Sequence, residues 1–123
     1  MIGKGCALAA VLLLGTGPAF AQGECVNPVA PAAIDGSTAT KEQMLAAHGD
    51  VLNFLKSSDD YQDCLDAAYK EQKEKAIKDK KPLDPQVAQQ VDDEIAANQR
   101  MKEKVGAEYN AAVVAYKAKH PNG

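Results

Sequence analysis

The residues with the most potential for chemistry form an acidic cluster, Asp59, Asp60, Asp63 and Asp66, with His48 and Asp50 nearby in the sequence. Carboxylates at such spacing can hold a hard cation such as calcium. The sequence has no EF-hand loop, however, and no H-x-x-x-H or C-x-x-C spacing of a zinc site. We therefore interpret the cluster as a solvated, cap-rich helical face and predict no metal site.

Catalytic groupings are scarce. The chain has two histidines, His48 and His120, and it lacks a glycine-rich phosphate loop, a G-x-S-x-G motif and the C-x-x-C-H motif of haem attachment. The serines are Ser37, Ser57 and Ser58, and each lies where a turn or a helix cap explains it. We predict that the protein is not an enzyme and has no catalytic residue and no cofactor.

The first 21 residues have the pattern of a cleaved secretory signal peptide. Lys4 is their only charge, an apolar run covers residues 6–14, and residues 19–21 read Ala-Phe-Ala. We predict cleavage between Ala21 and Gln22 and a periplasmic or secreted location. The apolar run is well short of the roughly 20 residues that span a bilayer, so no membrane insertion is expected after cleavage.

The predicted mature chain is small and acidic. The sequence carries 14 basic and 17 acidic residues. Removal of Lys4 leaves 13 against 17, a net charge of −4, and no long basic run remains. Nucleic acid and anionic membranes are therefore poor candidates as partners, because both attract a concentrated positive face.

Two cysteines, Cys25 and Cys64, remain after the predicted cleavage. An even pair in an exported chain usually forms a disulfide, whereas redox pairs usually lie as close as C-x-x-C. We predict the Cys25–Cys64 bond. A closed loop of this size would contribute roughly 3 to 4 kcal/mol to stability in the chain-entropy model.

The rest of the chain divides into an extended N-terminal coil, residues 22–39, and a helical domain, residues 40–120. Prolines and small residues dominate the coil. Thr40 and Gln43 then form a capping box at the start of a helix that we expect to run to about Lys80. A proline-containing connector leads to a second helix, with Asp84 as its N-cap, that we expect to run from Pro85 to about Lys119.

Short connectors join antiparallel helices, so the sequence predicts an all-α fold, an elongated helical hairpin with coiled-coil-like packing. The segment 57–60, Ser-Ser-Asp-Asp, could instead end one helix and start another, because serine and aspartate favour helix caps. A break there would give a three-helix bundle.

The disulfide constrains the coil. We expect the coil to turn at Ile34–Gly36 and to run back along the first helix, because only that path brings Cys25 to Cys64. We also expect Val26, Val29 and Ile34 to cover part of the apolar stripe of that helix.

Aromatic and polar residues on the helices are candidates for contacts. Helix packing accounts for most of them, with a recognition strip as the alternative. The residues of this predicted interaction surface are Tyr61, Tyr69, Asn98, Tyr109 and Tyr116. Asn98 interrupts the apolar seam and is expected to set helix register through a polar partner. Gly106 is expected to allow close helix approach.

One further pattern covers nearly all of the predicted mature chain. It comprises Pro31, Ile34-Asp35-Gly36, Ala39-Thr40, Glu42, Met44, Tyr61, Cys64-Leu65 and Tyr109-Asn110. This pattern resembles that of a group of small exported bacterial envelope proteins, most of them uncharacterised. The resemblance implies export, an envelope location and a helical shape, and it implies no catalytic role.

These features favour a non-enzymatic exported protein that acts by protein–protein contacts, in envelope assembly or in a stress or chaperone-like role. Two amphipathic helices in so small a domain leave apolar surface for a protein partner or for self-association into a four-helix bundle. The alternative is a periplasmic carrier of a small ligand or a metal ion.

Overall fold

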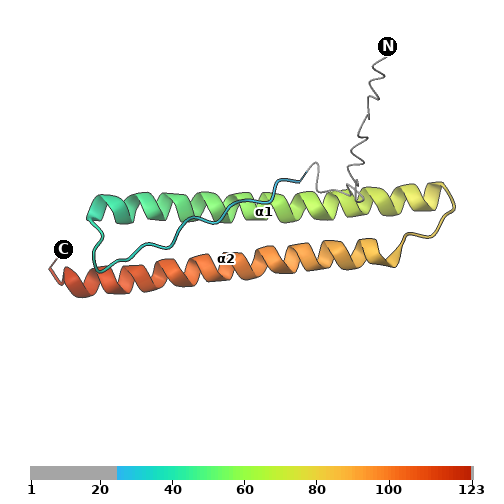
Figure 1. Ribbon diagram of the computed structural model, residues 1–123. Coiled ribbons are helices and arrows are strands. Elements are labelled where there is room, and N and C mark those ends of the chain that lie inside the picture. The colour runs from blue at the N-terminus through green and yellow to red at the C-terminus, as the bar shows by residue number, and fades with distance from the viewer. Residues whose placement is uncertain (1–24, 123) are drawn as a thin grey trace, which may run out of the picture.

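The chain forms a hairpin of two long antiparallel helices. The computed structural model describes residues 25–122, and within them it contains α1, Lys41–Lys78, and α2, Pro85–Lys119, with no strand. Figure 1 shows the two helices side by side, with the C-terminus near the start of α1. The predicted all-α class and helical hairpin are confirmed. The predicted signal peptide lies outside the described residues.

Both helices start at caps that the sequence predicted. The backbone N–H of Gln43 donates to the Thr40 hydroxyl at 3.1 Å, and the Thr40 N–H donates to the Gln43 side chain at 2.9 Å. At α2, the Asp84 carboxylate accepts from the Gln86 N–H at 2.9 Å, and Pro85 occupies the first helical position. These bonds satisfy backbone donors that have no partner inside the helix.

The C-terminal end of α1 comes two residues earlier than predicted. Lys80 has a left-handed backbone, with φ of 54°, so it cannot continue the helix. The N–H of Lys80 donates to the carbonyl of Ile77, and the N–H of Lys81 donates to that of Ala76. This arrangement is a Schellman motif, which reverses the chain just before the connector.

The alternative of a three-helix bundle is wrong, because α1 is continuous through residues 57–60. The Ser58 side chain is fully buried, and its hydroxyl accepts a hydrogen bond from the Asn98 amide at 3.2 Å. Ser58 therefore hydrogen-bonds across the hairpin to α2 and does not cap a helix.

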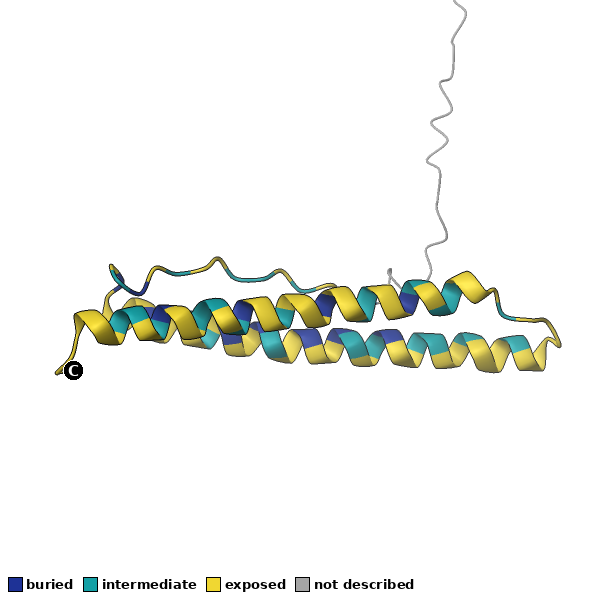
Figure 2. Cartoon of the chain, turned by 90° about the horizontal axis from the view of Figure 1, so that it is seen from below, coloured by how far each residue is buried: buried dark blue, intermediate teal, exposed yellow. Residues whose placement is uncertain are grey.

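The core is a chain of small clusters along the facing sides of the helices (Figure 2). From the connector end toward the start of α1, the clusters are Cys25, Tyr61, Leu65 and Val91, then Val51, Phe54 and Val105, and then Ala39, Met44 and Ala112. Asn98 and Ser58 lie between the first and second clusters along the helices. A two-helix interface of this kind leaves the outer sides of both helices in solvent.

Residues 25–39, which we call the strap, pack along the hairpin. The Cys25–Cys64 disulfide is present, with Cα atoms 5.6 Å apart, and it fixes one end of the strap near the middle of α1 (Figure 1). A turn at residues 36–38 reverses the chain toward α1, with Thr38 and Ala39 donating to the Asp35 carbonyl. The predicted disulfide and the predicted return of the coil along α1 are confirmed. The turn lies at residues 36–38 and not at 34–36, and the strap also contacts α2.

Two expectations for the strap and the seam are wrong. Ile34 packs against a core cluster as expected, but Val26 and Val29 are 80% and 90% exposed. The small side chain of Ala30, and not that of Val29, packs against Phe54 and its neighbours. Gly106 does not mediate close helix approach either, because a Cβ atom placed there would meet nothing within 4 Å.

Candidate functional site

The strap borders two cavities. The first, of about 580 Å³, lies between the strap, α1 and α2, and we call it the hairpin cavity. The second, of about 790 Å³, lies between the strap and α1 and is called the α1 cavity. Pro31 and Asp50 line both cavities, so the two are neighbours, and together we call them the strap groove. Each volume falls within the usual range of ligand pockets, about 300 to 1,000 Å³.

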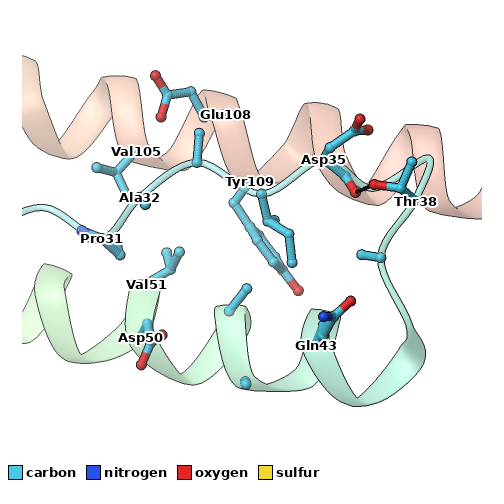
Figure 3. Close-up of a pocket in the computed structure, with 15 residues that line it drawn as sticks. Pro31, Ala32, Asp35, Thr38, Gln43, Asp50, Val51, Val105, Glu108 and Tyr109 are labelled. Atoms are coloured by element: carbon cyan, nitrogen blue, oxygen red, sulfur yellow. Dashed lines mark hydrogen bonds between the residues drawn. The ribbon is translucent and has the colours of Figure 1, made fainter.

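Small apolar side chains form most of the wall of the hairpin cavity. Figure 3 shows strap residues above α1, with the Tyr109 ring reaching from α2 into the space between the helices. The apolar lining residues include Ile34, Ala46, Ala47, Val51, Val105 and Tyr109. Two neighbouring positions of α1 that line this cavity, Ala46 and Ala47, have short side chains. These side chains do not reach the strap, so a space remains between the strap and α1.

Hydrogen bonds within the strap shape its turn at the end opposite the disulfide, and packing on α2 holds that end in place. The Asp35 carboxylate accepts from the Ser37 hydroxyl at 2.6 Å and from the Ser37 N–H at 2.9 Å. These bonds from Ser37 hold the pKa of Asp35 below its ordinary value of 3.8. The next residue after Asp35, Gly36, is buried against the backbone of Ala112 on α2. The strap is thus held at both ends.

The five residues of the predicted interaction surface do not form one surface. Tyr61 and Asn98 are buried between elements of the same chain, so neither is a surface residue. The Lys73 ammonium lies over the Tyr69 ring, 4.8 Å from the ring centroid. The Tyr116 ring stacks on His120 near the end of α2. Tyr109 lines the hairpin cavity, and Tyr61 borders the α1 cavity, which places these two in the strap groove.

Tyr61 lies beside the disulfide in the first core cluster. Burial raises the pKa of the Tyr61 phenol above its ordinary value of 10, and the negative charge of Glu94 adds to the shift. The folded chain therefore favours the neutral phenol, and stability falls as the pH rises through and beyond 10.

Asn98 has the polar partners that the sequence predicted. Its carbonyl oxygen accepts from the Gln62 amide at 2.9 Å, and its own amide donates to Ser58. Next to these hydrogen bonds along the helices, the Lys102 ammonium pairs with the Asp59 carboxylate. These bonds link α1 to α2 at one register, because a shift of either helix would leave Asn98 and Ser58 buried without partners.

We expect N98A to lower the free energy of unfolding by about 2 kcal/mol, because it removes both cross-helix bonds and leaves the buried Ser58 hydroxyl without its donor. Urea unfolding monitored by circular dichroism measures the change. N110A is the matched control, since Asn110 is exposed on the same helix. Equal unfolding midpoints for N98A and N110A would show that the hydrogen bonds of Asn98 contribute nothing to stability.

The acidic cluster does not form a candidate metal centre in the structure. Within residues 25–122, no group of three His, Cys, Asp or Glu side chains is arranged to hold a metal ion. Asp59, a member of the cluster, pairs instead with Lys102 on α2. In the same part of the chain, no helix has the length and apolar character needed to cross a membrane.

Apart from Tyr61 and Tyr109, the predicted interaction surface did not include the residues that line the strap groove. Asp50 and Glu108 lie on opposite walls of the hairpin cavity (Figure 3). The sequence indicated Asp50 only as a possible metal ligand, and Glu108 did not stand out from the other acidic residues. The pair Ala46-Ala47 was the available signal, because two adjacent small residues beside an apolar stripe leave room at that point. Comparisons with protein-family models, with curated proteins and with solved structures found no match to this chain.

Proposed function

We propose that this chain is an exported, non-enzymatic bacterial envelope protein that binds other polypeptides in the strap groove. The observation that carries the proposal is the pair of neighbouring cavities, about 580 and 790 Å³, along a strap that is held at both ends. A role in envelope assembly or in a stress response would use such binding.

The conformation of the strap favours a polypeptide as the ligand of the strap groove. The strap is an extended segment with two prolines that packs on a helical hairpin through Cys25, Ala30, Ile34 and Ala39. Val26 and Val29 extend from it into solvent at the edge of the α1 cavity, where a second extended segment could contact them. Exposed apolar side chains beside a groove are typical of interaction sites.

The disulfide and the N-terminal sequence support export. Disulfides persist in oxidising compartments such as the periplasm, and residues 1–21 have the pattern of a secretory leader. The envelope is therefore the compartment in which we expect the partner.

A peptide library tests the proposal. Selection on the oxidised protein should enrich binding peptides, and nuclear magnetic resonance should place the perturbed amides at Ala46, Ala47 and Asp50. A46W should abolish binding by filling the hairpin cavity, which Ala46 lines. A111W is the matched control, because Ala111 is exposed on α2 and lines neither cavity. Binding that is unaffected by A46W would contradict the proposed site.

A further inference from the structure

The charges along the strap groove all have one sign. Its charged lining residues are Asp35, Asp50, Asp60 and Glu108, and among the described residues no lysine or arginine lines either cavity. The groove also includes the apolar surfaces of both cavities. An occupant that matches this lining must be both apolar and positively charged.

Two of the four carboxylates already have partners. Ser37 donates two hydrogen bonds to Asp35, and the Lys104 ammonium lies 3.7 Å from the Glu108 carboxylate. Within residues 25–122, no hydrogen bond or ion pair engages the carboxylate of Asp50 or that of Asp60. Asp50 and Asp60 are therefore the groups available to a bound cation.

The spacing of these two carboxylates fits an extended peptide. Asp50 and Asp60 are ten residues apart on α1, or about 15 Å along the helix axis. An extended chain covers that distance in four to five residues, at about 3.3 Å each. The whole groove, from Gln43 to Cys64 along α1, is about 30 Å long, which is the length of about nine extended residues.

We propose that the strap groove selects cationic polypeptide segments of about nine extended residues. Two lysines or arginines four positions apart bind Asp50 and Asp60, and small apolar side chains between and beside them rest on the alanines and the Phe54 ring of the groove. This inference rests on the proposed function and deepens it, because it names the chemical class of the partner.

Peptides of matched length test the preference of the groove for positive charge. We would measure the binding of three fluorescent nonapeptides to the oxidised protein by anisotropy at low salt: one with lysines at its third and seventh positions in an Ala/Val/Pro background, one with glutamines there and one with glutamates. Exposed ion pairs are modest in strength, so the lysine peptide should bind about three- to tenfold tighter than the glutamine peptide. The glutamate peptide should bind more weakly than both, and added salt should reduce these differences.

Charge-matched variants show whether Asp50 and Asp60 cause the preference for the lysine peptide. D50N/D60N should reduce the affinity of the lysine peptide to that of the glutamine peptide and leave the latter unchanged. D63N/D66N removes the same charge from exposed positions of α1 that line neither cavity, and it should keep the preference for lysine. An equal loss in the two double variants would overturn the proposal, because it would show that overall net charge attracts the peptide.

The remaining outcomes separate this inference from the proposed function. Equal affinities for the lysine and glutamine peptides, both abolished by A46W, would leave polypeptide binding in place and overturn the charge selection. Failure of all three peptides and of the library selection would overturn both. A concentration-dependent dimer that A46W disrupts would assign the groove to a second copy of this chain and would likewise overturn the inference.

Discussion

The C25S/C64S double variant is expected to lose about 4 kcal/mol of unfolding free energy relative to the oxidised protein. The disulfide joins residues 39 positions apart, and in the chain-entropy model a loop of that length restricts the unfolded chain by about this amount. Domains of this size usually have only about 5 to 15 kcal/mol of stability. Denaturant unfolding of the oxidised protein and of the variant measures the difference.

The loss should begin in the strap. Within the described residues, no backbone hydrogen bond links residues 26–34 to either helix, so their attachment depends on the disulfide, on Ala30 and Ile34, and on the turn at residues 36–38. Without the disulfide, the strap should detach at the Cys25 end and expose Tyr61. The pKa of Tyr61 should then fall toward its ordinary value of 10.

Far-ultraviolet circular dichroism is the control for this prediction, because α1 and α2 have their own caps and interface and should remain helical when the strap detaches. A reducing agent should change the oxidised protein and leave C25S/C64S unaffected. An unchanged unfolding midpoint after reduction would contradict the predicted contribution of the disulfide to stability.

The elements of the fold could be predicted because their signals are local. The capping pair Thr40 and Gln43, the Asp84-Pro85 start and the cysteine pair each depend on a few neighbouring residues. The end of α1 was less predictable, since Lys80 adopts a left-handed conformation that glycine or asparagine usually occupies.

Tertiary contacts decided what the sequence left open. The role of Ser58 depends on Asn98, which is 40 positions away, so propensity alone could not distinguish a helix break from a buried hydrogen bond. The orientation of the strap depends on its contacts with the helices: Ala30 packs against the cluster of Val51, Phe54 and Val105, and Val29 stays in solvent. The strap groove is a consequence of that orientation and was therefore also beyond the sequence.

G36A is expected to lower the free energy of unfolding by about 3 kcal/mol, although it adds only one methyl group. A Cβ atom at position 36 would lie 1.8 Å from the carbonyl oxygen of Ala112 and 2.6 Å from its carbonyl carbon. Both are backbone atoms of a helix that cannot move aside, so the strap turn must lift from α2. Lifting the turn removes Ile34 and Ala39 from their core cluster, a loss typical of strong overpacking.

The other described glycines are matched controls for G36A. A Cβ atom at Gly49 in α1 or at Gly106 in α2 would meet nothing within 4 Å. G49A and G106A should therefore raise stability by up to about 1 kcal/mol each, because alanine is the better helix former. A similar gain in G36A would contradict the close contact between the strap turn and α2.

A double-mutant cycle shows why Gly36 and the disulfide should act as one unit. Both hold the same segment, at opposite ends, so the second change acts on a strap that the first has already loosened. We expect G36A to destabilise the C25S/C64S background by about 1 kcal/mol, well below its effect in the oxidised protein. Full additivity in urea unfolding would show that the two ends are independent. Coupling of this size would show that the position of the strap, and with it the lining of the groove, depends on both ends together.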